Sequence, residues 1–340
     1  MSDDYLWDRS GEPDPEVQRL ELLLGRFRSR EPVPEIHVLS SHVDHRPFRA
    51  LWKALAAIAA MTIFALGPWL LIRKSLPTWE VATLEGAPEI DSGRIGGTGH
   101  LTMGQWLETD ATSRALLNIG EIGQAEIEPN TRLRLLATRV TEHRIDLLRG
   151  TLHATIWAPP RLFFVDTPSA TAVDLGCAYT LTVDVTGASL LRVTYGWVAF
   201  DFHGHESIAP EGALCATRPG VGPGTPYFED SSQTFQRALT RLDFGRLAPP
   251  DRSEALSTVL EEARPRDVLT LWHLLSRVDA SERESVYNRM AKLVPPPAGV
   301  NRNGILHLDR NMLDLWWDQL GLGETSWLRM WKGSWPGPLK

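Results

Sequence analysis

The amino-acid sequence predicts a mainly β protein, a sandwich or roll, with one transmembrane helix and a small α-helical region towards its C-terminal end. Three observations lead to this prediction. A 19-residue run without charge lies at 54–72, short segments rich in β-forming residues fill 79–217, and helical periodicity begins after residue 230. Strands separated by turn residues at intervals near ten are typical of a β sandwich, barrel or roll.

Residues 54–72 are the predicted membrane segment. The run from Ala54 to Ile72 has Thr62 as its one polar side chain. A helix of this length covers about 28 Å, close to the hydrocarbon thickness of a bilayer. The alternative is a buried core helix, but such helices are rarely free of polar residues for five turns. We therefore expect residues 54–72 to span a membrane and to contact lipid.

The charges beside this run predict its orientation. Three basic residues precede it (Arg46, Arg49 and Lys53), whereas Arg73 and Lys74 follow it. Because basic residues concentrate on the cytoplasmic side, the count favours a cytoplasmic N-terminus. The expected location is the inner, cytoplasmic membrane, with the C-terminal region periplasmic or otherwise extracytoplasmic.

Residues 1–30 are predicted to form a cytoplasmic helical segment, followed by a juxtamembrane linker at 31–53. Pro15 suits the first position of a helix, and the apolar residues after it repeat with helical spacing. A short helix cannot bury its own apolar face, so a protein partner, the membrane surface or a second copy must cover it. The many acidic residues favour a basic protein surface. The expected partner-binding residues are Tyr5, Leu6, Trp7, Val17, Leu20, Leu23, Leu24 and Phe27.

The β region at 79–217 is followed by a predicted Gly/Pro linker at 218–230 and a helical region at 231–340. A capping box at Ser281 and Glu284 predicts one helix start, and Gly321 predicts a helix end. Five tryptophans occupy the last 25 residues. They can bind an aromatic or sugar ligand, but packing of a compact helical core is the favoured role. Their positions are Trp316, Trp317, Trp327, Trp331 and Trp335.

Composition and motifs argue against several functions. With 23% charged residues and a formal net charge of −7, the chain gives no reason to expect nucleic-acid binding. A nucleophile elbow, a phosphate-binding glycine loop and an HExxH motif are all missing from the sequence. We therefore expect no enzymatic activity, no catalytic residue and no cofactor.

Two clusters need separate interpretation. His203 and His205 lie two residues apart and can share a metal on a strand, but further ligands at suitable spacing are missing and a polar hairpin loop explains them better. No metal site is therefore predicted. Cys177 and Cys215 both lie on the side expected to be oxidising, which favours a disulfide between them over two buried thiols.

The order and spacing of the β segments resemble the FecR domain, the extracytoplasmic module of bacterial transmembrane regulators. The resemblance runs from Gly99 to Glu211, about a third of the chain, and departs from the family at Cys177, where many relatives carry threonine. The N-terminal segment resembles the helix of anti-sigma factors without their zinc ligands. The matching segments are Gly99–Asp110, Gly123–Leu135, Leu147–Ile156, Phe163–Val183 and Arg192–Phe200.

The resemblance implies a sensor or scaffold domain rather than a catalyst. The function expected from it is a single-pass regulator whose extracytoplasmic domain receives a signal and whose N-terminal segment acts on a sigma factor or another cytoplasmic regulator. The alternative is a cell-envelope scaffold that binds an envelope protein or polysaccharide at its β domain without signalling. A sigma-factor gene beside this one would favour the first function.

Overall fold

The computed structural model describes residues 15–25 and 78–322. The chain divides into two compact units, Met1–Leu71 and Ile72–Lys340, and each is described by itself. In the first unit, helix α2 spans Pro15–Leu24 with Pro15 at its first position, as the sequence predicts. The expected membrane segment at 54–72 lies outside the described residues. Among the residues that are described, no helix has the length and apolar character needed to cross a membrane.

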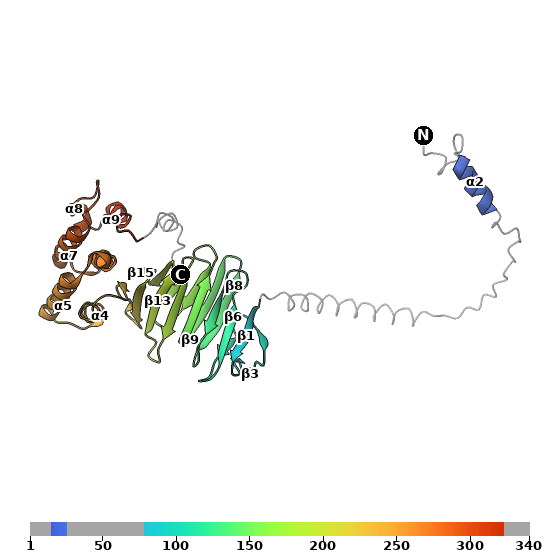
Figure 1. Ribbon diagram of the computed structural model, residues 1–340, viewed down its shortest axis with the longest axis horizontal. Helices are drawn as coiled ribbons and strands as arrows, with labels where there is room; N and C mark the ends of the chain where they lie inside the picture. The colour runs from blue at the N-terminus through green and yellow to red at the C-terminus, as the bar shows by residue number, and fades with distance from the viewer. Residues whose placement is uncertain (1–14, 26–77, 323–340) are drawn as a thin grey trace, which may run out of the picture. The chain divides into compact units, whose positions relative to one another are not determined.

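The second unit is mainly β with helices after the strands, which agrees with the predicted fold class (Figure 1). Its strands form two ladders, here called sheet A and sheet B. The neighbour order in sheet A is β4 (Thr98–Leu101), β1 (Trp79–Glu85), β6 (Arg114–Asn118), β7 (Gly123–Ile127), the second half of β9 (Glu142–Ile156), β12 (Ala178–Val183), β13 (Ser189–Tyr195) and β16 (Ala213–Arg218), whose other edge pairs with β17 (Gly222–Pro223) and β18 (Tyr227–Phe228).

Sheet B is antiparallel except where β9 and β10 run parallel. Its neighbour order is β3 (Gly93–Arg94), β2 (Glu89–Ile90), β5 (Trp106–Glu108), β8 (Arg132–Arg139), the first half of β9, β10 (Phe163–Asp166), β11 (Thr171–Asp174), β14 (Trp197–Phe202) and β15 (His205–Pro210).

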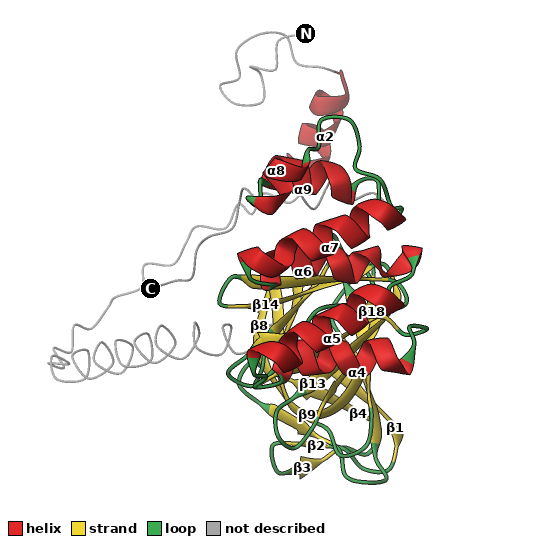
Figure 2. Ribbon diagram, turned by 90° about the vertical axis from the view of Figure 1, so that its left-hand side faces the viewer, coloured by secondary structure: helices red, strands yellow, loops and turns green. Residues whose placement is uncertain are grey.

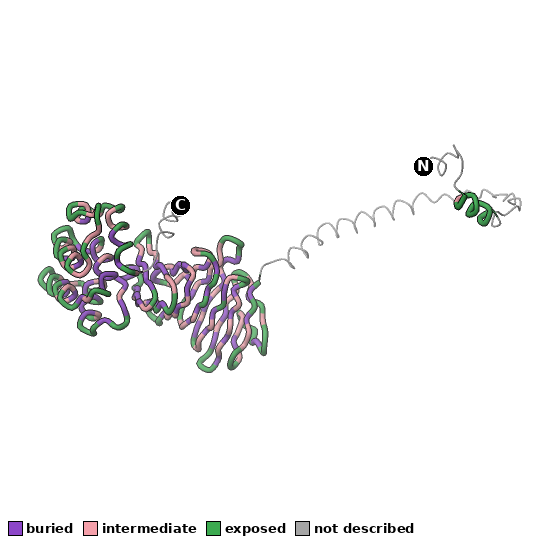
Figure 3. Tube along the Cα trace, turned by 45° about the horizontal axis from the view of Figure 1, so that its top comes forward, coloured by how far each residue is buried: buried purple, intermediate pink, exposed green. Residues whose placement is uncertain are grey.

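The chain builds this body by placing strands alternately in the two sheets. Hairpin β6–β7 belongs to sheet A, β10–β11 to sheet B, β12–β13 to sheet A and β14–β15 to sheet B. Along strands such as β8, β12 and β13, buried positions alternate with more exposed ones. The inward side chains form one continuous core, and Figure 3 marks the buried residues in purple along the chain trace.

The segment at 218–230 is not a free linker. It contains β17 and β18, which pair with β16, and Gly222 to Pro226 are all buried. Glycine and proline occur here because backbone packs closely against other atoms. A Cβ added at Gly222 would approach the ring of Phe202 to 2.6 Å. The turn residues that suggested a linker instead close the edge of sheet A.

The helices follow in pairs (Figure 2). Helix α4 packs on α5, α6 packs on α7, and α5 also contacts α7. Trp316 and Trp317 of α9 are buried in the core, which confirms their predicted packing role, whereas Trp327, Trp331 and Trp335 lie outside the described residues. The helices are α4 (Gln233–Phe244), α5 (Pro249–Glu262), the 3-10 turn η2 (Pro265–Asp267), α6 (Val268–Arg277), α7 (Ala280–Leu293), α8 (Arg302–Leu306) and α9 (Arg310–Trp317).

One predicted helix start is wrong by two residues. The capping box of α7 is formed by Asp279 and Glu282 rather than by Ser281 and Glu284. Aspartate caps a helix as well as serine does, and a glutamate again lies three residues later. Helix α9 begins after Asp309, whose side chain accepts from Met312 N, and it ends at Trp317, before the predicted stop at Gly321.

Candidate functional site

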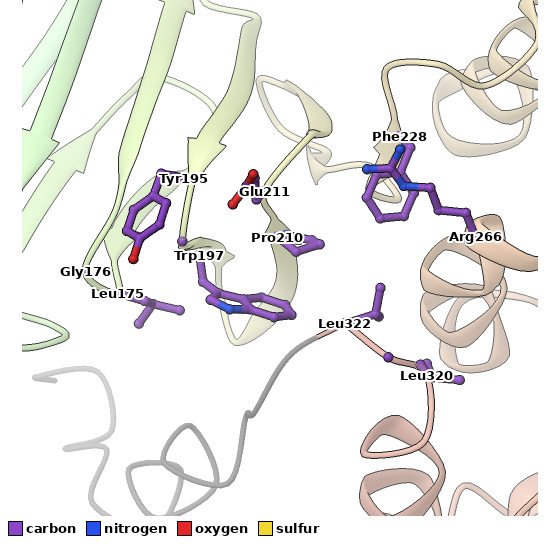
Figure 4. A pocket seen from close by; sticks show the side chains of 12 residues that line it. Leu175, Gly176, Tyr195, Trp197, Pro210, Glu211, Phe228, Arg266, Leu320 and Leu322 are labelled. Carbon is purple, nitrogen blue, oxygen red and sulfur yellow. The ribbon is translucent and has the colours of Figure 1, made fainter.

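A cleft of about 540 Å³ lies between the β strands and the helical region (Figure 4). Tyr195 and Trp197 form its aromatic wall on the β side, next to Glu211. Phe228 and Arg266 lie on the opposite side. Leu320 and Leu322, which follow α9, complete the lining. We call this the aromatic cleft.

Gly196 places the two aromatic residues of the wall. It separates β13 from β14 and adopts a φ of +74°, which L residues rarely adopt. A side chain there would also collide with Gly176 O and approach Cys177 Cα to 3.1 Å. The chain therefore crosses from sheet A to sheet B within one residue, and Tyr195 and Trp197 flank that crossing. Tyr195 remains 68% exposed, and Trp197 is half-buried.

The helical region holds one side of the wall in position. The rings of Trp197 and Trp317 lie 6.0 Å apart with their planes at 47°. Trp317 in turn meets Trp272 of α6 edge to face at 4.6 Å. Such tilted aromatic pairs are favourable beyond the apolar area that they bury. A shift of α9 relative to the strands would therefore change the position of Trp197 in the aromatic wall.

The charges of the aromatic cleft are unevenly balanced. The Arg266 guanidinium lies 4.1 Å from the ring centroid of Phe228, and its Nη1 pairs with Asp230 at 3.3 Å. The Glu211 carboxylate is exposed at the turn between β15 and β16, and no described residue forms an ion pair or hydrogen bond with it. The uncompensated charge of the cleft is therefore negative.

A second polar cluster joins the strands to helix α6. Arg277 donates from Nη1 to Pro223 O (3.0 Å) and Thr225 Oγ1 (3.5 Å), and from Nη2 to Glu206 O and Ser207 Oγ. Asp243 of α4 accepts from Thr225 N (2.7 Å) and Thr225 Oγ1 (2.8 Å). Burial lowers the pKa of Arg277 and raises that of Asp243, and the attraction between the two charges opposes both shifts. We call these residues the junction cluster.

The junction cluster lines a polar cavity of about 290 Å³ together with His205 and Arg252. It is not a convincing anion site, because the four Nη hydrogens of Arg277 are all directed at oxygen atoms of the β unit. Arg252 is paired with Glu282 at 3.2 Å. Arg277 thus links α6 to the strands, and Arg252 links α5 to α7.

His273 adds a buried link at the same junction. Ile208 N donates to its Nε2 (3.1 Å), so that nitrogen is an acceptor and the imidazole is neutral. The proton on Nδ1 is then donated to Leu269 O (2.9 Å). Thr270 Oγ1 likewise donates to Pro226 O (2.8 Å). Helix α6 is thus attached to β15 of sheet B, and to the segment between β17 and β18, by directional hydrogen bonds.

A buried carboxyl group lies behind the wall of the aromatic cleft. Asp174 ends β11, and its carboxyl accepts from Gly176 N (2.7 Å) and from the Cys177 thiol (2.6 Å). Burial raises the pKa of Asp174 to about 7 and that of the Cys177 thiol well above its ordinary value. Gly176, whose N–H donates to Asp174, also lines the cleft.

This carboxyl group predicts how stability depends on pH. The unfolded chain loses the Asp174 proton near its ordinary pKa of 3.8, whereas the folded chain keeps it until about 7. The folded state therefore binds more protons between these values, and the free energy of unfolding falls as the pH rises through them. The full shift corresponds to about 4 kcal/mol.

Replacement of Asp174 by asparagine should remove that slope. From pH 5 to pH 8, the stability of Asp174→Asn relative to the wild type should increase by about 2–3 kcal/mol. Urea unfolding of both proteins at the two pH values measures this difference. Parallel pH profiles for the two proteins would contradict the prediction.

The predicted disulfide is not formed in this structure. Cys177 and Cys215 are both free and buried, and each thiol has its own partner. Cys177 donates to Asp174, whereas Cys215 Sγ donates to Gly224 O at 3.4 Å. Cys177 precedes β12 and Cys215 lies within β16, and β13 separates these strands in sheet A. The pair therefore gives no support to the predicted compartment.

The histidine pair lies in a tight hairpin. His203 and Gly204 form the two-residue turn between β14 and β15, with φ values of 53° and 81°. Positive φ at both positions is the geometry of a type I′ turn, so the hairpin explanation is confirmed. Within the described residues, no group of three or more potential ligands could hold a metal ion.

The predicted partner helix presents its apolar residues to solvent (Figure 3). Leu20, Leu23 and Leu24 are 57%, 53% and 63% exposed, and Val17 is half-buried. No residue of α2 is buried. Tyr5, Leu6, Trp7 and Phe27 lie outside the described residues. Over Pro15–Leu24, the helix therefore has the exposed apolar face that the sequence predicts.

Sequence reasoning missed the aromatic cleft. Gly196 ahead of Trp197, Val198 and Phe200 predicts the start of an alternating strand; β14 does start at Trp197, but its buried residues are consecutive rather than alternating. The available signal was the pair of aromatic residues around a glycine that lies between two strands of different sheets. Glu211 and Arg266 gave no signal, because nothing in the sequence places them near Trp197.

Comparison with known proteins adds a partial likeness. No family model and no curated protein sequence matches the chain. Two crystal structures, at 1.65 Å and 2.50 Å resolution, of a Parabacteroides distasonis protein provisionally assigned as an anti-sigma factor are similar to it. They are 15% and 14% identical over 40% of this chain, each with a TM-score of 0.33. This chain spans 64% of the length of that protein, which is less than two thirds.

Proposed function

We propose that this chain is a single-pass membrane regulator of the anti-sigma kind. In this proposal residues 54–72 cross the inner membrane, residues 1–53 bind a sigma factor or another cytoplasmic regulator, and the β unit with its helices receives an extracytoplasmic signal without catalysing a reaction. The exposed leucines of α2 carry the proposal. Their helix belongs to a compact unit of its own, and none of its residues is buried.

The character of α2 supports a protein partner. A helix of 10 residues is marginal in water, and covering its apolar face would stabilise it. Burial of two leucine side chains contributes about 3–6 kcal/mol to an interface before the cost of association. The two acidic residues of α2, Glu16 and Glu21, outnumber Arg19, which favours a basic protein surface over anionic lipid. The resemblance of the N-terminal segment to anti-sigma helices points in the same direction.

The test replaces Leu20 and Leu24 by aspartate together. Because both side chains would lie in the interface, the amount of co-purifying regulator should fall at least about tenfold, and the transcription of its target genes should change. The measurements are quantitative mass spectrometry of proteins purified with the full-length chain and target-gene transcript levels.

The matched control is Gln18→Asp with Leu22→Asp. These positions lie on the opposite side of α2 and add the same charge, so the control should retain its partner. Normal partner recovery and unchanged transcription in the Leu20/Leu24 variant, at normal protein levels in the membrane, would reject the regulator proposal. The envelope scaffold would then be the better function.

A further inference from the structure

The aromatic cleft has the features of a binding site for an organic cation. Aromatic rings attract cations through the negative potential of their faces, and Trp is the strongest of them. Trp197 and Tyr195 both line the cleft, and Tyr195 is 68% exposed. Exposed large aromatics that gather around a hollow mark ligand or partner sites more often than scattered ones do.

The charge of Glu211 defines the sign of the ligand. Its carboxylate lies next to the aromatic wall (Figure 4), and no described residue neutralises it. The guanidinium of Arg266, on the other side of the cleft, is already paired with Asp230. A bound cation could therefore satisfy Glu211 while its alkyl groups contact Trp197, whereas an anion would meet the unpaired carboxylate.

The protein already uses this chemistry once in the cleft. Arg266 lies over Phe228 with its guanidinium carbon 4.1 Å from the ring centroid. The aromatic wall opposite, formed by Trp197 and Tyr195, has no cation of its own among the described residues. A cation–π contact is thus formed at Phe228, whereas the rings of Trp197 and Tyr195 remain available for a bound cation.

The size of the cleft and its lining favour an organic ligand over a metal ion. About 540 Å³ is within the usual range for small-molecule sites. Among the lining side chains, only Glu211 and Tyr195 carry oxygen atoms, and the described residues contain no group of three metal ligands.

We propose that the aromatic cleft binds a small alkylated ammonium compound, with its cationic head between Trp197, Tyr195 and Glu211. This deepens the proposed function, because it gives the ligand class of the signal-receiving unit. The site itself does not depend on α2, so the two proposals fail separately.

The experiment is calorimetric titration of the full-length chain, in a non-ionic detergent, with choline. Its neutral isostere 3,3-dimethylbutan-1-ol has the same shape without the charge. Choline should bind with a dissociation constant between about 0.1 and 5 mM, and the isostere should bind at least about tenfold more weakly. Glucose, a neutral ligand that also stacks on aromatic rings, should not bind.

Variants locate the binding. Trp197→Leu and Glu211→Gln should each weaken choline binding at least about fivefold. Two matched controls, Trp157→Leu and Glu80→Gln, remove an exposed indole and an exposed carboxylate that do not line the cleft, and they should bind normally. Glu211→Gln changes one exposed side chain, so it should unfold at the wild-type temperature.

Three results would overturn the proposal. The first is no heat of binding with 20 mM choline, a concentration of about four times the weakest expected dissociation constant. The second is equal affinity for choline and its isostere. The third is an equal loss of choline affinity in the cleft variants and the control variants. Binding of glucose without choline would assign the cleft to saccharides instead. None of these results bears on the partner of α2, which is measured by co-purification.

Discussion

Alanine in place of Gly150 should lower the free energy of unfolding by about 3 kcal/mol or more, because it combines backbone strain with a collision in the core. Gly150 adopts a φ of +98° at the point where β9 leaves sheet B and enters sheet A. Thr131, which is 1% exposed, lies closest to the position of the added Cβ. An added Cβ would overlap Thr131 backbone and side-chain atoms, with Thr131 Cβ at only 2.6 Å.

Thr131 cannot move away without losing hydrogen bonds. Its Oγ1 accepts from Thr151 N at 2.9 Å, and its own N–H donates to Thr109 Oγ1 at 2.9 Å. The control is Gly104→Ala, where φ is +88° but nothing lies within 4 Å of the new Cβ. It should cost about 1 kcal/mol, from backbone strain alone. Urea unfolding measures both variants, and equal losses would show that the collision is relieved by local movement.

The alternation of residues is what made the β region predictable. Most inward residues of β8, β12 and β13 are apolar and occur at every second position, and a pattern of that period indicates a strand. Asn130 after Pro129 predicts a tight turn, and Asn130 does adopt a left-handed φ of 59°. Pro15 and the apolar spacing after it similarly predicted α2. These signals are local, so one sequence was sufficient to detect them.

Pairing between distant strands was not predictable in the same way. Strand β9 has 15 residues and serves both sheets, but its sequence does not state where it changes from one to the other. The parallel neighbour β10 follows β9 directly, although two consecutive strands usually pair antiparallel. The glycines and prolines at 218–230 looked like a linker, because composition alone cannot distinguish a solvated turn from a closely packed one.

The two candidate sites also differ in whether local sequence was enough to predict them. The exposed face of α2 follows from helical spacing within ten residues, so the sequence was sufficient. The aromatic cleft combines the turn after β11, the β13–β14 crossing, the turn after β15, β18, the η2 turn and the chain after α9. These six segments extend from Leu175 to Leu322, and the chain must fold before Glu211 and Arg266 line the same cleft. Only the tertiary structure brings these charges together.

Arg277→Met should destabilise the protein by about 3 kcal/mol, because it removes the cation that links α6 to the strands. Its four directed hydrogen bonds end on Pro223 O, Thr225 Oγ1, Glu206 O and Ser207 Oγ, and these oxygens would lose their donor. Asp243 would also lose the positive charge that opposes its burial. Leaving buried oxygens without a charged donor costs about 1–3 kcal/mol, and the lost attraction to Asp243 adds to it, so about 3 kcal/mol is expected for the partly exposed Arg277.

A second substitution separates the charge effect from the lost hydrogen bonds. Asn at 243 can still pair with Thr225 N and Thr225 Oγ1, so Asp243→Asn in the Arg277→Met background should recover about 1–2 kcal/mol. Arg139→Met is the matched surface control. The Arg139 side chain is 73% exposed and 3.9 Å from Glu142, so its loss should change stability by less than about 0.5 kcal/mol. Urea unfolding followed by tryptophan fluorescence measures all three variants. If Asp243→Asn gave no recovery, the attraction between the two charges would be unimportant, and the junction would depend on the hydrogen bonds of Arg277 alone.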